Sequence, residues 1–510
     1  MLSPIKLKLQ SIASQKCNGV AAPPPLSNLN YEHNMNCKEL HIDVQPGQPF
    51  KNDLFGLSSF ADMLTGIVDS YSDTGAVITL NGEWGIGKTT FLRMWNQYLI
   101  DKQYRTLFFN AWQCDYYDDP MLALIGELSE EFGESAGFQE FVKKGGRLAF
   151  RFGGEFLKGI VRKTTGTDLD AVVDEVTNMG IESVKDYRES KNLLEDFKKH
   201  LSEIVADPNN KKPVVFIIDE LDRCNPQFAV KLLERLKHLF EVPNIIFVLG
   251  LNTEQLQYAV QGFYGSSSIN GNEYLKRFFD VELSLPTPKL DVYCKALFDS
   301  QGINEYFNQY EKAGWVSDRE RESTRFSDCA CDLIIATNTN LRKAYRIIHY
   351  MRLVFAGCSH NSPMNSDLLF LLCFLKVNHP ATFEKIHHHE FSIQELLDEI
   401  ERILPSSILL QVQQYGAPRR MAWVIAKLLL YYNHLDGHGS ILDKKFTGSL
   451  IETENKYSYP VKPHIIAATT LYDGLRWHEN NSQAPFEIGI DALIKKIQLT
   501  DSIHIPIMRY

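Results

Sequence analysis

Hydrophobic and polar residues follow two different periods along the chain, and the change near residue 289 separates two kinds of structure. Before that point, short apolar runs rich in β-branched residues alternate with segments of helical period, such as 60–71. The runs predict five β-strands, at 77–80, 106–110, 214–218, 244–249 and 280–285. Strands that alternate with helices are typical of a parallel sheet buried on both faces. After residue 289, apolar residues recur at helical spacing, which predicts helices alone.

The same patterns predict how the chain is divided into domains. Residues 1–45 are polar and rich in Asn and Ser, which predicts a poorly ordered tail. An α/β domain follows at 46–288, and a long, mostly helical insertion at 121–205 separates its second and third strands. We expect a helical lid at 289–350 and a C-terminal helical domain at 351–510.

A glycine-rich turn with the pattern Gly-x-x-x-x-Gly-Lys-Thr joins the first predicted strand to the helix after it. Glycines allow backbone N–H groups to face phosphate oxygens, and the N-terminus of the following helix favours an anion. Lys88 is predicted to reach the β- and γ-phosphates, and the Thr89 hydroxyl to ligate Mg²⁺. The residues predicted to contact the nucleotide are Gly82, Glu83, Trp84, Gly85, Ile86, Gly87, Lys88, Thr89 and Thr90.

Polar residues follow two of the later predicted strands. Asp219 and Glu220 follow the strand at 214–218, which is the most apolar of the five. After a phosphate loop, this pair predicts that Asp219 holds Mg²⁺ with Thr89, and that Glu220 orients and deprotonates the attacking water. Asn252 follows the strand at 244–249 and is predicted to contact the γ-phosphate, with a plain turn residue as the alternative.

Two further groups of residues have binding chemistry. Residues 339–343 predict a capped helix start with two cations, Arg342 and Lys343, in its first turn. Cations there oppose the helix dipole, which indicates a local partner such as a bound polyphosphate. The run His387-His388-His389 followed by Glu390 has metal-ligating residue types, but a solvated helix end is the favoured interpretation.

Composition limits the function classes. The 510 residues carry a net charge of -10, which argues against a chain-wide nucleic-acid footprint, although the segment 143–168 within the insertion is basic. Nine scattered cysteines without paired Cys-x-x-Cys motifs favour reduced thiols in the cytoplasm. The apolar run 421–432 is interrupted by Lys427 and is far shorter than the roughly 20 residues of a membrane span.

Four motifs together resemble the KAP family of P-loop NTPases. They are Gly-Glu-Trp-Gly-Ile-Gly-Lys-Thr-Thr at 82–90, Phe-Asn-Ala-Trp-Gln at 109–113, Ile-Ile-Asp-Glu-Leu-Asp-Arg-Cys at 217–224 and Asn-Leu-Arg-Lys at 340–343. The third is the most specific of the four. The resemblance covers roughly residues 50–350.

The resemblance implies a five-stranded parallel sheet of the additional-strand type with a helical lid, which binds ATP and Mg²⁺. By position it implies that Lys88, Thr89 and Asp219 handle phosphate and metal. Glu220 would be the base, and Arg342 falls where the family places a lid arginine. Arg223 and Arg277 are weaker candidates for an arginine finger, with structural salt bridges as the alternative.

The resemblance also bears on the biological setting. Many family members carry transmembrane helices in the insertion, but residues 121–205 are not apolar enough to span, which indicates a soluble, bacterial-type branch in the cytoplasm. A bacterial member acts in phage exclusion, which implies antiphage defence as one setting. Three functions remain open. One is a homo-oligomeric ATPase motor or switch with an unidentified protein partner or effector. The others are a nucleotide-gated scaffold with slow turnover and a nucleic-acid remodeller, which the acidic balance disfavours.

Overall fold

The computed structural model describes most of two lobes. The residues described are 44–116, 120, 123–124, 195, 198–199, 201–203, 212–237, 242–312, 322–357, 365–410, 420–433, 461–481 and 490–498. The predicted N-terminal tail at 1–45 and the predicted helical insertion at 121–205, with its basic stretch 143–168, lie almost wholly outside these residues.

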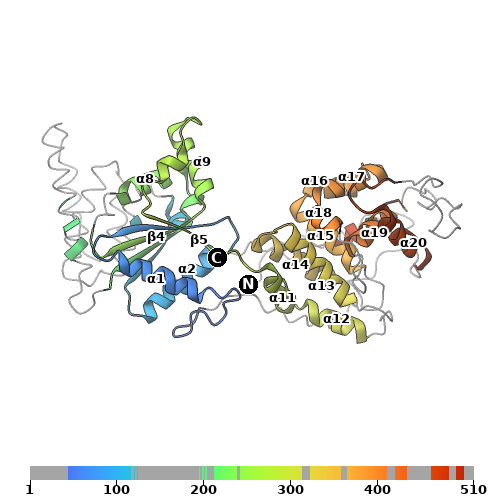
Figure 1. Ribbon diagram of the computed structural model, residues 1–510, viewed down its shortest axis with the longest axis horizontal. Coiled ribbons are helices and arrows are strands. Elements are labelled where there is room, and N and C mark those ends of the chain that lie inside the picture. The colour runs from blue at the N-terminus through green and yellow to red at the C-terminus, as the bar shows by residue number, and fades with distance from the viewer. Residues whose placement is uncertain are drawn as a thin grey trace, which may run out of the picture.

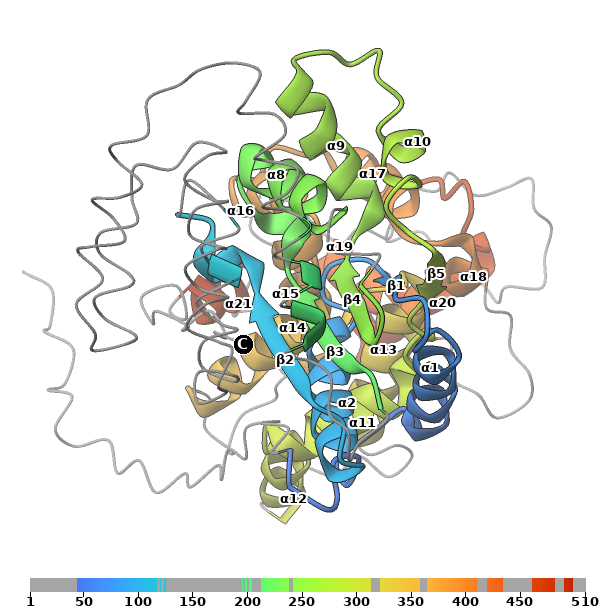
Figure 2. The same cartoon turned by 90° about the vertical axis from the view of Figure 1, so that its left-hand side faces the viewer.

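The first lobe is built on a five-stranded sheet in which every pair of neighbouring strands is parallel. The strands are β1 (Ala76–Asn81), β2 (Thr106–Asn110), β3 (Val214–Asp219), β4 (Ile245–Leu251) and β5 (Val281–Ser284). Their order in space is β2-β3-β4-β1-β5, as Figure 2 shows, so β4 lies between β1 and β3. An additional strand in this position is what the resemblance implied, and the predicted α/β fold class is confirmed.

Helices cover both faces of the sheet, because the strand side chains alternate between two apolar cores. In β4, Phe247 and Leu249 belong to the core beneath α8 (Pro226–Lys237) and α9 (Thr253–Tyr264). Ile246 and Val248, one residue along in each case, belong to the core beneath α1 (Ser58–Ser70) and α2 (Lys88–Asp101). Figure 1 shows the two helix pairs on opposite sides of the strands. This two-sided burial explains why the strand sequences are continuously apolar.

Strand β4 is two residues longer at its C-terminal end than the sequence pattern predicts. Gly250 resembles a strand breaker in isolation, yet it pairs with Leu80 of β1 and with Asp219 of β3. A side chain at this position would meet Leu92 Cδ1 at 2.4 Å, so glycine here allows helix α2 to pack closely on the sheet. The end of β4 is thereby aligned with the ends of β1 and β3.

The second lobe is entirely helical in the described residues and has one continuous apolar core. Its helices are α11 (Leu290–Ser300), α12 (Ile303–Lys312), α13 (Glu322–Ala336), α14 (Leu341–Ala356), α15 (Ser366–Asn378), α16 (Pro380–His387), α17 (Ile393–Ile403), α18 (Ser406–Leu409), α19 (Arg420–Asn433), α20 (Ala468–Asn481) and α21 (Ile490–Gln498). Helix α15 is the central one, since every residue from Ser366 to Leu375 is buried. Within the described ranges, no helix is both long enough and apolar enough to cross a membrane.

An ion pair joins α15 to α19 inside this core. The Lys427 ammonium lies 2.7 and 2.8 Å from the two carboxylate oxygens of Asp367, and both side chains are buried. Lys427 is the cation that interrupts the apolar run 421–432. Its charge is therefore compensated within the lobe instead of by solvent.

Candidate nucleotide site

The loop between β1 and α2 requires glycine at two positions and is closely packed at a third. Gly85 has φ +83° and Gly87 has φ +100°, both in the left-handed region that side chains disfavour. At Gly82, an added Cβ would lie 2.2 Å from Ile86 Cδ1. The loop thus folds tightly enough to return the chain to the start of α2 at Lys88. A tight loop that ends at a helix N-terminus is the backbone geometry of a phosphate site.

Lys88 lies inside this loop and bridges its backbone. Its ammonium donates hydrogen bonds to the carbonyls of Gly82 at 2.5 Å and Glu83 at 3.0 Å. Burial lowers the pKa of Lys88, although the nearby carboxylates of Asp222 and Asp219 act in the opposite direction. A partly desolvated cation that donates to neutral carbonyls interacts strongly with an anion that enters the loop.

Asp219 has an unsatisfied buried oxygen at the end of β3. Its Oδ1 accepts a hydrogen bond from the Glu220 amide at 2.9 Å, whereas its Oδ2 is buried and has no hydrogen-bond partner among the described residues. Burial raises the pKa of Asp219 to about 6, and the neighbouring Thr89 hydroxyl acts to lower it. A buried carboxylate oxygen without a donor, beside a hydroxyl, fits the hard oxygen ligands that Mg²⁺ prefers.

Glu220 is held by two partners. Its Oε1 pairs with Arg223 Nη1 at 2.6 Å, and its Oε2 accepts a hydrogen bond from Asn110 Nδ2 at 3.1 Å. The backbone of Glu220 has φ +62°, a conformation that costs about 1–3 kcal/mol for a residue other than glycine. Strain of this kind is common at functional sites, and here it directs the side chain toward β2.

Asn110 also belongs to this cluster, although no motif predicts a role for it. It ends β2 and pairs in register with Asp219 at the end of β3, which brings it beside Glu220. The only signal in the sequence was its place within the motif at 109–113. For Arg223, the structural salt bridge is the interpretation that the geometry supports, since its partner is Glu220 of the same chain.

Two half-exposed tryptophans contact charged residues that follow β3. Trp84 in the loop donates from Nε1 to Asp222 Oδ2 at 2.5 Å, so the loop is linked to the segment after β3. Trp112 lies 5.6 Å from the Arg223 guanidinium, in a cation–π arrangement. Trp112 is 50% exposed, so much of its ring faces solvent.

The start of α14 packs against the phosphate loop. An added Cβ at Gly85 would lie 3.0 Å from Arg342 Cβ and 3.3 Å from Asn340 Oδ1. Asn340 caps the helix by accepting a hydrogen bond from the Lys343 amide at 2.9 Å, as the sequence predicts. The charge of Arg342 is among those that lower the pKa of Lys88. Two cations and the N-termini of α2 and α14 therefore face one loop.

The other predicted site residues are less closely tied to the loop. Asn252 is the N-cap of α9, and its Oδ1 accepts from the Gln255 amide at 3.2 Å, so it has a structural role whatever else it contacts. Contact of Asn252 with a γ-phosphate stays a prediction. Arg277 is exposed after α10 (Gly271–Leu275), and its role as an arginine finger also stays a prediction.

The chain resembles solved structures only distantly. A search of curated proteins finds no match. Similar solved structures include Drosophila ORC bound to DNA, with 14% identity over 77% of this chain and 89% of that chain and a TM-score of 0.31. Another is the Aeropyrum pernix ORC2 protein in its ADPNP-ADP complexes, with 13% identity over 88% and 95% and a TM-score of 0.31. Likenesses this weak carry no argument.

The family model is the informative match. The model of the KAP family P-loop domain matches residues 57–355, more than half of the chain. Those residues include the phosphate loop, Asp219, Glu220 and the start of α14. On this match and on the strand order, the chain belongs to the KAP family of P-loop domains.

Proposed function

We propose that this protein is a Mg²⁺-dependent ATPase that acts as a switch on a protein partner. The observation that carries the proposal is the convergence of charge at one loop. Lys88 and Arg342 face it with two helix N-termini, while the unpartnered oxygen of Asp219 lies behind it. Such a site is suited to a polyphosphate with a divalent cation.

Each side chain has a role in this proposal. Lys88 and the loop amides bind the β- and γ-phosphates, and Thr89 with Asp219 would hold Mg²⁺. When bound, Mg²⁺ supplies positive charge that neutralises the phosphate oxygens. Glu220 accepts the proton of the attacking water through a lone pair that its contacts with Asn110 and Arg223 leave open.

A switch also needs a way to transmit the state of the nucleotide. Helix α14 touches the phosphate loop at its first turn, and further along it contributes Ile347, Ile348 and Met351 to the core of the helical lobe. Loss of the γ-phosphate removes negative charge beside Arg342, which weakens the hold of the loop on α14. We infer that hydrolysis thereby changes the position of the helical lobe, which acts on the partner.

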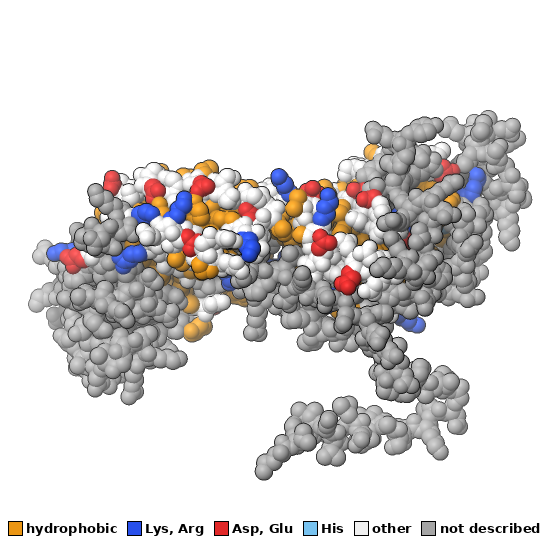
Figure 3. Space-filling model, turned by 90° about the horizontal axis from the view of Figure 1, so that it is seen from below, with side chains coloured by type: hydrophobic (Ala, Val, Ile, Leu, Met, Phe, Trp, Pro, Cys, Tyr) orange, Lys and Arg blue, Asp and Glu red, His pale blue; other side chains and the backbone are white. Residues whose placement is uncertain are grey.

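Slow turnover is a second candidate, and one observation favours it. Both oxygens of Glu220 are engaged, so the base is restrained until something releases it. The protein would then be a nucleotide-gated scaffold of several copies in the cytoplasm. Nucleic-acid remodelling is less supported, because the net charge is -10. On the face that Figure 3 shows, acidic and basic side chains are interspersed. Antiphage defence is a setting that the family resemblance suggests.

Substitution of the loop lysine tests nucleotide binding. We expect Lys88→Ala to weaken ATP binding at least tenfold, because hydrogen bonds to charged groups contribute about 1.5–3 kcal/mol. Titration calorimetry with ATP and Mg²⁺ measures the change. Lys102→Ala, at the exposed C-terminal end of the same helix, is the matched control. Unchanged affinity in Lys88→Ala would reject the assignment of the phosphate loop.

Substitution of the arginine beside Glu220 tests the restraint. We expect Arg223→Ala to raise partner-free ATP hydrolysis by roughly fivefold, since a pair worth about 1 kcal/mol no longer holds the carboxylate. Phosphate release is the measurement, and Arg93→Ala on the exposed side of α2 is the control. A large fall in rate would show instead that Arg223 takes part in the reaction.

A further inference from the structure

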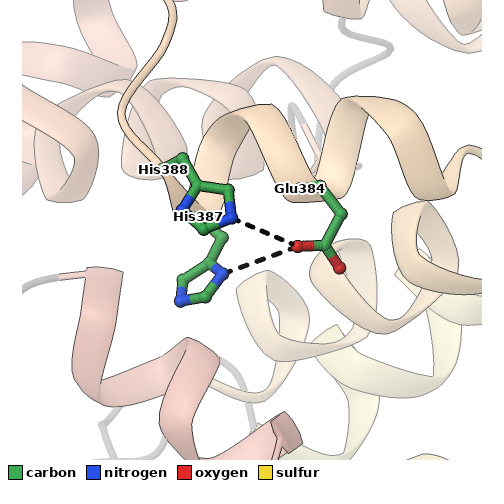
Figure 4. A group of neighbouring side chains, drawn as sticks. All are labelled: Glu384, His387 and His388. Carbon is green, nitrogen blue, oxygen red and sulfur yellow. Dashed lines mark ion pairs between the residues drawn. The ribbon is translucent and has the colours of Figure 1, made fainter.

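Three ligand-type side chains converge at the C-terminal end of α16, in the helical lobe and outside the nucleotide site (Figure 4). Glu384 Oε2 lies 3.6 Å from His387 Nδ1 and 3.7 Å from His388 Nε2. The three donor atoms all lie within 4.8 Å of one another. Residues three and four apart on a helix share a face, which explains how one turn brings them together.

The separations are too long for direct hydrogen bonds and leave space for an ion between the side chains. A hydrogen bond between nitrogen and oxygen spans about 2.7–3.2 Å, so distances of 3.6 and 3.7 Å are too long. Four ligands placed tetrahedrally about 2.05 Å from a zinc ion are about 3.3 Å apart. The two observed distances exceed this value by a few tenths of an ångström, which small side-chain rotations remove.

The backbone at His389 separates this histidine from His387 and His388, with which the sequence groups it. His389 has φ +54°, which turns the chain away from the helix. Its ring stacks on Tyr432 with centroids 4.9 Å apart, and its Nε2 lies 3.1 Å from Asp491 Oδ1. His389 is therefore committed elsewhere, and Glu384, one turn earlier, faces the other two histidines in place of Glu390.

A neighbouring helix contacts this cluster. The side-chain amide nitrogen of Gln498 at the end of α21 lies 3.2 Å from Nε2 and 3.3 Å from Nδ1 of His387. This contact restricts rotation of the ring. An amide nitrogen only donates, so the outer-partner role found beside metal-bound histidines requires the amide turned over, with its oxygen accepting from the outer ring N–H. Glu384 and His388 are 59% and 60% exposed, so an ion has a direct path from solvent.

We propose that Glu384, His387 and His388 bind one divalent transition-metal ion. Two imidazoles and a carboxylate are a ligand set of Zn²⁺, with a water molecule in the fourth position. Mg²⁺ does not compete well there, because it prefers oxygen ligands in octahedral geometry. The site is separate in residues and in ion class from the proposed Mg²⁺ position at Thr89 and Asp219.

The test is Zn²⁺ binding by the full chain without a histidine tag, titrated calorimetrically in excess Mg²⁺. We expect one strong site in the wild type and at least tenfold weaker affinity in His388→Ala and Glu384→Gln. Tetrahedral Co²⁺ bound in its place would show visible absorption that both variants lack. His464→Ala, an exposed histidine beside the single carboxylate of Asp398, is the matched control.

Two further measurements test whether Zn²⁺ binds at this cluster and not at the nucleotide site. Zn²⁺ should raise the unfolding temperature of the wild type but not that of His388→Ala, because a ligand stabilises only the state that binds it. Asp219→Asn should keep the strong Zn²⁺ site even if it abolishes nucleotide binding. Absence of a strong site in the wild type, or unchanged affinity in both His388→Ala and Glu384→Gln, would overturn the proposal.

Discussion

Glu220→Gln is expected to bind ATP as the wild type does and to hydrolyse it at least a hundredfold more slowly. An amide cannot accept the proton of the attacking water, and general-base catalysis contributes about 10²–10⁴-fold. Glutamine has the shape of glutamate, and its carbonyl oxygen can still accept from Asn110 or Arg223. Phosphate release, measured beside ATP affinity, separates loss of chemistry from loss of binding.

A control variant and the mass of the protein distinguish an ATPase switch from a nucleotide-gated scaffold. Glu305→Gln, exposed on α12 in the helical lobe, should hydrolyse ATP at the wild-type rate. Equal rates for Glu220→Gln and the wild type would place the base elsewhere. If the wild type itself turns over negligibly but gains mass by size exclusion when ATP is added, the nucleotide-gated scaffold becomes the better description.

Lys427→Met is expected to lower the free energy of unfolding of the helical lobe by about 3–5 kcal/mol. Methionine fills similar volume, but it leaves the Asp367 carboxylate buried without its cation, and an uncompensated buried charge is costly. Urea unfolding measures the loss, with the emission of Trp423 and Trp477 on α19 and α20 as a local signal. Following this lobe alone matters because the two lobes need not unfold together.

The loss of stability in Lys427→Met should depend on pH. In the wild type, burial raises the pKa of Asp367, but Lys427, the Leu368 amide and Arg325 together outweigh burial, and the net pKa is lowered. The pair therefore stabilises fully above the unfolded value of about 3.9, and its contribution is lost as pH falls through the folded pKa. In Lys427→Met, burial acts without the lysine and raises the pKa, so stability increases as pH falls. The difference between the two proteins should be largest at neutral pH.

Two further variants test whether the unpaired buried charge of Asp367 causes the loss of stability. Lys276→Met removes an exposed partner of Glu273, and it should cause no measurable loss. Asp367→Asn combined with Lys427→Met removes the buried charge altogether and should recover most of the stability. A single Lys427→Met variant as stable as the wild type at neutral pH would show that Asp367 reaches solvent when the lysine is absent.

Local patterns were sufficient for most of the backbone. The five strands lie where apolar runs predicted them, and the glycine-rich turn joins β1 to α2 as its motif indicated. Strand β4 extends beyond its predicted end because sheet pairing at Gly250 overrides a local breaker signal. Boundaries of this kind depend on a neighbouring strand, which a single segment of sequence does not specify.

By itself, the sequence determined the α/β fold class, the phosphate loop and the order of Asp219 and Glu220, since these follow from local period and spacing. Only the tertiary structure decided which side chains meet. Asn110 reaches Glu220 through strand register across 110 residues, and Arg342 reaches Gly85 through packing of the helical lobe. At the end of α16, the left-handed backbone of His389 takes its side chain to Asp491, and Glu384 lies beside His387 and His388 instead. The physical reason is that local sequence governs backbone conformation, whereas contacts between distant side chains depend on how whole elements pack.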